Sequence, residues 1–243
     1  MSEQNRFEYN YKRVLEEYER LKDEDVPLIE DKEGKYFGVN FPFENHIAKN
    51  WTVIRNELDL KREQLTKFFE HAGDQYYGKN EDGIKVSFGS YYTYALYFGQ
   101  QPYKWFQAMF PETCKLIQSC PLIYNAGFII ANGKSGLNPH YGPGADIDWP
   151  MLRGQTILSG DGNSLLSQLH DDKIYVKTQV EGESFYFDDT NMHWTQNYSD
   201  DERIVLVYDF LDPKRDKGNY SWKNHEGVNN NFVYLLANHG KNK

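Results

Sequence analysis

The sequence predicts an α+β fold, in which helices come first and a β-sandwich, β-barrel or jelly roll follows. Three observations lead to this prediction. Apolar residues in the first half recur at helical spacing, the second half consists of short β-branched and aromatic runs separated by turns, and no linker rich in Pro or Ser divides the halves. The 243 residues are therefore interpreted as one domain, with a helical part at about 1–120, a β-core at about 121–213 and a C-terminal extension at 214–243.

The helical part opens with an amphipathic pattern that breaks over residues 24–35, which contain Pro27 and Gly34. A second helix is predicted from Asn45, because asparagine is a favourable N-cap residue. The apolar positions of the first pattern are Tyr11, Val14, Leu15, Tyr18 and Leu21. Those that share one broad face of the second helix are Trp51, Ile54, Leu58, Leu65 and Phe68.

Between this helix and the β-core, the stretch 87–110 is rich in Tyr and Phe and has no secure assignment, except that Lys104–Phe110 suits a helix. Pro111 opens another short helix, because proline is favoured at the first helical position. That helix is expected to end near Pro121.

The second half is predicted to be β-structure because its apolar runs are short and rich in β-branched and aromatic residues. The clearest runs are Tyr124–Ala131, Ile174–Val180, Ser184–Phe187 and Ile204–Phe210. The turns between strands have the sequences NGKSG at 132–136, SGDGN at 159–163 and EGE at 181–183.

Composition excludes several classes of function. With 27 Lys and Arg against 36 Asp and Glu, the net charge is −9, which argues against a nucleic-acid binder. Two cysteines give no disulfide framework and no cysteine-based zinc site. No apolar run approaches the length of a membrane span and the N-terminus does not look like a signal peptide, so no membrane partner and a cytoplasmic location are expected. The oligomeric state is not encoded in any recognisable pattern.

Three polar residues in the predicted β-core are candidates for chemistry. His140 lies at a strand end before a Gly/Pro turn, His193 lies between two strand-like runs, and Arg203 opens a strongly β run ten residues later. Two imidazoles from different strands, with a cation deeper in a barrel, can form a metal site with an anion anchor. A single histidine at a strand end is more often structural, and an arginine there is usually solvated, so the residue types alone leave both interpretations open.

The motifs around these residues resemble the aspartyl/asparaginyl β-hydroxylase family. The resemblance covers roughly residues 45–213, and its order of motifs is fairly specific. The matching segments are Pro139-His140-Tyr141-Gly142-Pro143, Phe187-Asp188-Asp189 before His193, Arg203, and upstream 50–55 and 111–116.

This resemblance implies a double-stranded β-helix core, a cupin-like jelly roll, and an oxygenase that uses Fe(II), 2-oxoglutarate and O2. His140 and His193 would bind the metal, and the co-substrate would chelate iron through its 1-carboxylate and 2-oxo group. Arg203 would hold the far carboxylate in a planar, two-point geometry that lysine does not provide. Oxidative decarboxylation to succinate and CO2 would then accompany hydroxylation of a C–H bond.

The third metal ligand is the open question in this pattern. Most such oxygenases carry Asp or Glu two residues after the first histidine, where this chain has Gly142, and the resembled family also has a glycine. Asp146 or Asp148 can loop back as a ligand, and His170-Asp171-Asp172 is a literal His-x-Asp motif that lies close before His193. A vacant position can also accept chloride, as in related iron halogenases.

A second anion ligand is expected from the strand that follows His140. Arg153 matches the family's arginine if the loop at 144–150 is longer, and Gln155 then replaces the family's histidine. A rival alignment places Arg153 in an insertion. Asp188 and Asp189 are either turn residues or partners that steady His193.

The leading hypothesis is an Fe(II)/2-oxoglutarate-dependent hydroxylase of an unactivated C–H bond, acting on an amino-acid or peptide side chain. The family also includes lipid hydroxylases, a branch that the absence of a membrane span disfavours. A halogenase using the same two histidines and a non-catalytic cupin-like binding module are the alternatives.

Overall fold

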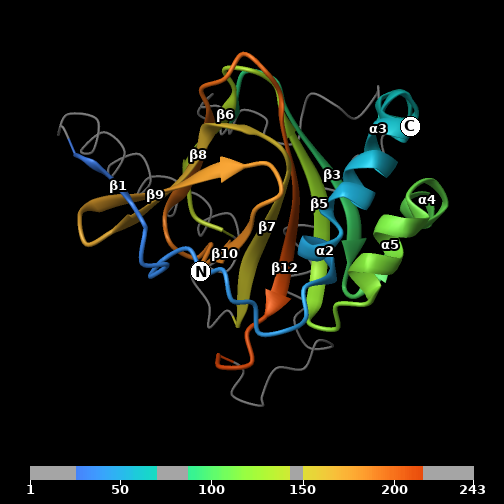
Figure 1. The fold of residues 1–243 in the computed structure, drawn as a ribbon, viewed down its shortest axis with the longest axis horizontal. Helices are drawn as coiled ribbons and strands as arrows, with labels where there is room; N and C mark the ends of the chain where they lie inside the picture. The colour runs from blue at the N-terminus through green and yellow to red at the C-terminus, as the bar shows by residue number, and fades with distance from the viewer. Residues whose placement is uncertain (1–25, 70–86, 143–149, 216–243) are drawn as a thin grey trace, which may run out of the picture.

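The computed structural model describes residues 26–69, 87–142 and 150–215. Its core consists of two six-stranded sheets that face each other (Figure 1). The strands are β1 Leu28–Glu30, β2 Ser87–Phe88, β3 Tyr91–Phe98, β4 Gln101–Pro102, β5 Ile123–Ala131, β6 Gly136–His140, β7 Met151–Ser159, β8 Asp161–His170, β9 Lys173–Val180, β10 Ser184–Phe187, β11 His193–Asn197 and β12 Arg203–Leu211. The helices are α2 His46–Lys49, α3 Trp51–Phe69, α4 Lys104–Met109 and α5 Pro111–Gln118.

The strand order is that of a double-stranded β-helix, which confirms the predicted fold class. The major sheet has the order β10-β7-β12-β5-β3-β4, and the minor sheet has the order β1-β9-β8-β11-β6-β2. From β5 to β12 the chain passes back and forth between the sheets, so that four strands of each sheet form the jelly roll. All pairs within this core are antiparallel, and β1 is added parallel to β9 at the edge of the minor sheet.

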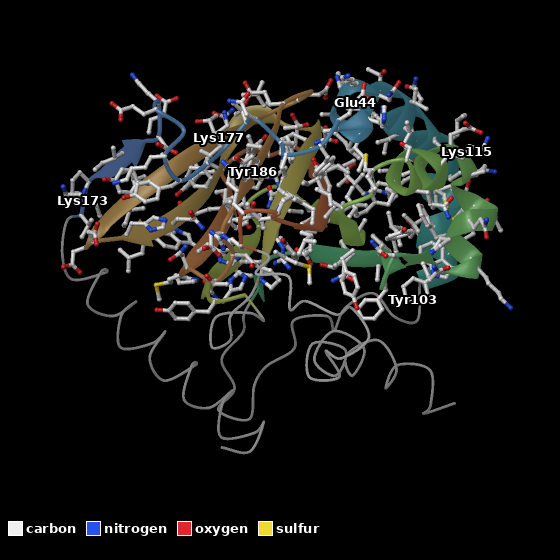
Figure 2. The ribbon with its side chains drawn as sticks, turned by 90° about the horizontal axis from the view of Figure 1, so that it is seen from below. Glu44, Tyr103, Lys115, Lys173, Lys177 and Tyr186 are labelled. Atoms are coloured by element: carbon white, nitrogen blue, oxygen red, sulfur yellow. The ribbon has the colours of Figure 1, made fainter. Side chains whose placement is uncertain are left out.

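The helices cover the outer face of the major sheet, as Figure 1 shows beside β5 and β12. Asn45 caps α2 by accepting a hydrogen bond from the Ala48 N–H at 3.1 Å, as the sequence predicts. In Figure 2, Lys173 on β9 and Lys115 on α5 lie on opposite sides of the molecule, with the sheets between them. Fully buried side chains joining the helices to the sheet include Ile54, Leu58, Leu65, Phe106, Phe110, Phe128 and Leu206.

Strand β12 shows how the two faces of the major sheet are used. Successive side chains of a strand point to opposite faces. Ile204, Leu206, Tyr208 and Phe210 pack in the cluster shared with the helices. The alternate residues face the barrel interior: Arg203, Val205, Val207 and Asp209. The interior of the barrel therefore carries charged residues at both ends of this strand and apolar residues between them.

Most predicted elements are confirmed, with two corrections, the first being that the single helix expected from Asn45 is divided at Asn50 into α2 and α3. Strands β5, β9, β10 and β12 match the predicted runs, and α4 and α5 lie where helices are expected. The part at about 1–120 is not purely helical, because β3 and the shorter β1, β2 and β4 belong to the sheets. Tyr91 packs with interior residues, Tyr94 and Leu96 pack in the cluster shared with the helices, and β3 lies between β5 and the short edge strand β4.

Strand β8 is absent from the predicted runs because its sequence, DGNSLLSQLH, has no β-branched or aromatic residue. The predicted helix around 11–21 and nearly all of the C-terminal extension lie outside the described residues. In the ranges that the structure covers, no helix combines the length and apolar character needed to cross a membrane.

Candidate active site

His140 ends β6 and His193 begins β11, and the two residues lie directly opposite each other in the minor sheet. Their ring centroids are 4.3 Å apart and the ring planes are tilted by 53°. The ring of His193, which is 3% exposed, packs against Phe187 on β10. The structure thus brings together the two histidines that the sequence singles out, at one end of the barrel.

The hydrogen bonds of the pair define which ring nitrogens are available. Nδ1 of His140 lies 2.8 Å from the carbonyl oxygen of Asn138, and Nδ1 of His193 lies 2.9 Å from that of Asn191. Because a carbonyl oxygen only accepts, Nδ1 carries the proton in both rings and the lone pair is on Nε2. This arrangement is the one that a metal ligand requires.

Burial keeps both rings neutral. It lowers the pKa of His140 to about 4, although the hydrogen bond to Asn138 acts in the opposite direction. Burial and the neighbouring His140 also lower the pKa of His193 well below its usual value. At pH 7 both imidazoles are therefore in the form that binds a metal ion.

Gly142 is required by the close approach of the two loops that carry the histidines. A Cβ atom at residue 142 would lie 2.3 Å from Oδ2 and 2.6 Å from the backbone oxygen of Asp189. The Gly142 N–H donates to that backbone oxygen at 2.7 Å. The space that a carboxylate ligand at residue 142 would enter is thus already filled by Asp189.

The paired acids before His193 have different roles. Asp188 is a turn residue, because its Oδ1 accepts from the N–H and hydroxyl of Thr190 at 3.1 and 2.7 Å. It also pairs with Arg215 at 2.8 Å.

The Asp189 side chain is 2% exposed and lies 3.1 Å from Nη2 of Arg153. Burial raises the pKa of Asp189 to about 6, against the opposing effect of Arg153. Asp189 is thus the acid that packs between the histidine loops.

Arg203 is a buried cation without an ionic partner. Its side chain is on the interior face of β12, the residue is 2% exposed, and no carboxylate among the described residues forms an ion pair with it. Nη1 donates to Oε1 of Gln179 at 2.6 Å, whereas Nη2 is buried with no hydrogen-bond partner. Burial lowers the pKa of Arg203, and Tyr91 opposes this shift. An uncompensated buried charge is costly, so Arg203 is suited to receive an anion.

Arg153, in contrast, is paired with two carboxylates. Its Nε and Nη2 donate to the carboxylate of Asp209 at 2.8 and 3.2 Å, and Nη2 also lies near Asp189. Gln155, two residues later on the same interior face of β7, is 4% exposed and accepts from Nε2 of Gln179 at 2.7 Å. Gln155 therefore belongs to the neighbourhood of Arg203, while the role of Arg153 as an anion ligand stays a prediction.

The candidate third ligands do not join the histidine pair in the described part of the chain. Asp146 and Asp148 lie outside the described residues. Asp172 forms with Asp171 the two-residue turn between β8 and β9, and both have positive φ angles, 59° and 48°. His170 stacks on Tyr36 with centroids 3.8 Å apart. Within the described ranges, no group of three His, Cys, Asp or Glu side chains is arranged to hold a metal ion.

Two residues of the site were not singled out in the sequence. Asp209 has the same inward phase as Arg203, so the period-2 pattern of the run from 203 to 210 could have identified it. Gln179 shows no such signal, because an inward-facing glutamine on β9 looks like any polar strand residue. Its contact with Arg203 appears only when the two sheets face each other.

The buried histidines are expected to destabilise the metal-free protein in acid. Their pKa values in the fold lie below the ordinary value of 6.5, so between about pH 6.5 and 4 the unfolded chain binds more protons and acidification favours unfolding. A shift to about 4 corresponds to about 3 kcal/mol for His140 alone. Denaturant unfolding at pH 7 and pH 5 measures the part of this loss that falls between the two pH values, about 2 kcal/mol for His140 alone.

The raised pKa of Asp189 acts with the opposite sign, because the folded protein keeps a proton below about pH 6 that the unfolded chain releases. Two histidines outweigh one carboxyl group, so the net effect is a loss of stability in acid. In the double variant His140→Gln/His193→Gln the sign should reverse. Equal stability of the wild-type protein at both pH values would contradict buried, neutral histidines.

Replacing Gly142 by alanine is expected to cost about 1–3 kcal/mol, because the added methyl group meets backbone as well as side-chain atoms of Asp189. The movement of this loop should also weaken metal binding. Gly162→Ala is the control: its Cβ has room, at 3.8 Å from Val180, but its φ of +84° adds strain of about 1–2 kcal/mol. Thermal unfolding and the affinity for an added divalent metal ion separate the two, since only Gly142→Ala should lower that affinity.

A double-stranded β-helix with two facing imidazoles in its interior defines a cupin-like protein. A family model described as aspartyl/asparaginyl beta-hydroxylase matches residues 48–213. The chain belongs to this family, which confirms the resemblance identified in the sequence. Family membership supports an oxygenase-type hydroxylase.

Among curated proteins, the chain is similar to an ornithine lipid ester-linked acyl 2-hydroxylase from Rhizobium tropici, with 27% identity over 185 residues. The match covers 73% of this chain and 60% of that protein, so the chain spans less than two thirds of its relative. Similar solved structures include a prolyl-4-hydroxylase from Pseudomonas putida, with 15% identity, a TM-score of 0.44 and coverage of 74% and 95% of the two chains. A 2OG-Fe(II) oxygenase family oxidoreductase from Burkholderia pseudomallei has 14% identity, a TM-score of 0.37 and coverage of 51% and 68%.

Proposed function

We propose that this protein is an Fe(II)- and 2-oxoglutarate-dependent dioxygenase that hydroxylates an unactivated C–H bond. One observation carries the proposal: two neutral imidazoles with available Nε2 atoms share a barrel with a buried guanidinium that has no counter-ion. Imidazole suits Fe(II), and a guanidinium suits a carboxylate. The residues present therefore fit both the metal and the co-substrate.

In this proposal His140 and His193 hold the iron through Nε2, and their Nδ1 hydrogen bonds keep the rings in place. Iron with 2-oxoglutarate supplies the activation of O2. Arg203 binds the far carboxylate of the co-substrate and offsets its charge inside the barrel. Gln155 and Arg153 face the same interior from β7 and are proposed to contact the co-substrate. The positive charge of Arg153 is shared with its two ion-pair partners, Asp189 and Asp209.

The proposed substrate is a small molecule or peptide whose amino-acid side chain is hydroxylated. The relative from Rhizobium tropici is named as a lipid acyl hydroxylase, so an ornithine lipid belongs in any substrate panel. A cytoplasmic location is proposed because both cysteines are free and a reducing compartment preserves Fe(II). No nucleic-acid or membrane partner is proposed.

The test is anaerobic addition of Fe(II) and 2-oxoglutarate, followed by O2. A visible charge-transfer band and succinate formation stimulated by one member of a panel of amino acids, peptides and ornithine lipid are expected. Iron binding without any response to 2-oxoglutarate would contradict the proposal. No iron and no band would favour the non-catalytic cupin-like module.

The halogenase is the second candidate, because Gly142 stands two residues after His140, where most such oxygenases carry a carboxylate ligand. A chloride ion in this position would lie next to the Asp189 carboxyl group, because that group fills the space beside Gly142. When ionised, the Asp189 carboxylate repels an anion. Hydroxylation is therefore favoured. Turnover with and without chloride distinguishes the two, since a chlorinated main product would establish the halogenase.

A further inference from the structure

We propose that Gln179 on β9 is a positioning residue for the co-substrate: it holds the Arg203 guanidinium in place without cancelling its charge. This inference rests on the proposed function, because the anion that Arg203 receives is the far carboxylate of 2-oxoglutarate. The two residues lie on strands that are not neighbours in a sheet, β9 and β12. Gln179 comes from the minor sheet and Arg203 from the major sheet, so the contact spans the barrel.

The first step of the argument is the hydrogen-bond chain. Oε1 of Gln179 accepts from Nη1 of Arg203 at 2.6 Å, and its Nε2 donates to Oε1 of Gln155 at 2.7 Å. Gln179 is fully buried and the other two residues are nearly so. Both ends of the Gln179 amide are thus used, which fixes the orientation of the amide and holds Nη1 of the Arg203 guanidinium in place.

The second step is charge. An aspartate or glutamate at this place would satisfy Nη1 equally well, but it would form a buried ion pair and leave no net charge for a ligand. An amide oxygen satisfies the same N–H and leaves the positive charge intact. Arg153 shows the contrasting case in the same barrel, because Asp209 and Asp189 are its partners.

The third step is the vacant side of the guanidinium. With Nη1 held by Gln179, the buried Nη2 has no partner. The hydroxyl of Thr195, which lies on the inward face of β11 and is 5% exposed, is also buried without a partner. Thr195 pairs with Leu137, which packs with Tyr91 beside Arg203. Unsatisfied buried polar groups of this kind are rare and are suited to a polar ligand.

Two near-isosteric variants test the inference. Gln179→Met removes the hydrogen bond and is expected to weaken 2-oxoglutarate binding about 10-fold, the effect of one hydrogen bond to a charged group. Gln179→Glu places a carboxylate on Nη1 and is expected to weaken binding by about 100-fold or more, since it also neutralises the anchor. Gln64→Glu, an exposed glutamine on α3, is the control for the added charge.

The readout is the dissociation constant in anaerobic Fe(II) titrations with 2-oxoglutarate and with pyruvate, a 2-oxo acid that has no far carboxylate. A positioning role predicts a loss for 2-oxoglutarate and little change for pyruvate, together with a raised KM and a nearly unchanged kcat in succinate formation. A structural role would lower the unfolding temperature and affect both ligands equally, which would overturn the inference.

The two proposals fail in different ways. If the wild-type protein does not prefer 2-oxoglutarate to pyruvate, the proposed co-substrate is wrong. If the wild-type protein shows this preference and Gln179→Glu retains it, the proposed function stands and the role of Gln179 is wrong. Both variants keep the length of the glutamine side chain, so both are expected to fold. If one variant fails to fold, the other still tests the role of Gln179.

Discussion

Replacing His193 by alanine is expected to abolish metal-dependent turnover and to lower iron affinity by more than ~100-fold, since removing even the hydrogen-bond partners of a metal ligand costs about 10–100-fold. Only two protein ligands are proposed, so the loss of one leaves a single imidazole. His140→Ala should have the same effect. Iron content after anaerobic reconstitution and succinate formation are the measurements.

The fold should survive this change. His193 is buried in its neutral form, and the metal-free variant loses one hydrogen bond to a backbone carbonyl and the packing of the ring against Phe187 and His140. The matched control is His170→Ala, which removes a histidine that stacks on Tyr36 and lies outside the facing pair. Iron binding at the wild-type level in His193→Ala, or its loss in His170→Ala, would show that the metal site has been assigned to the wrong residues.

Replacing Arg203 by lysine is expected to raise the dissociation constant of 2-oxoglutarate about 10–100-fold, the range for hydrogen bonds to a charged group. Lysine keeps the charge but loses the planar two-point geometry. Arg203→Met should abolish binding while leaving the ligand-free protein as stable as the wild type or more stable, because it removes an uncompensated buried charge.

Calorimetric titration and denaturant unfolding measure the two effects. Arg62→Met is the control, since Arg62 forms a partly exposed ion pair with Glu202, at 2.6 Å, and such pairs contribute about 0–1 kcal/mol. Marked destabilisation of Arg203→Met with unaltered 2-oxoglutarate binding would mean that Arg203 is a structural residue and that the anion is held elsewhere.

The sequence predicts the fold well where pattern and local chemistry agree. Residues Arg203 to Phe210 are rich in β-branched and aromatic residues, and they form the central strand β12. Asn45 is a good N-cap and does cap α2. Strand β8 is harder to predict, because a sequence rich in Leu, Ser and Gln becomes a strand through its neighbours in the sheets rather than through its own propensity. Strand β3, in contrast, is rich in Tyr and has high strand propensity, yet it lies in the stretch for which the sequence gives no secure assignment.

The chemical residues follow the same division. The sequence by itself determined which residues are candidates, the two histidines and Arg203, because the motifs around them resemble those of the family and are recognised without coordinates. Only the tertiary structure decided the states of their partners: Asp189 fills the space beside Gly142, Arg153 is neutralised by two carboxylates, and Gln179 reaches Arg203 across the barrel. Motifs record residues near each other along the chain, whereas burial and charge compensation depend on side chains from strands that meet only after folding.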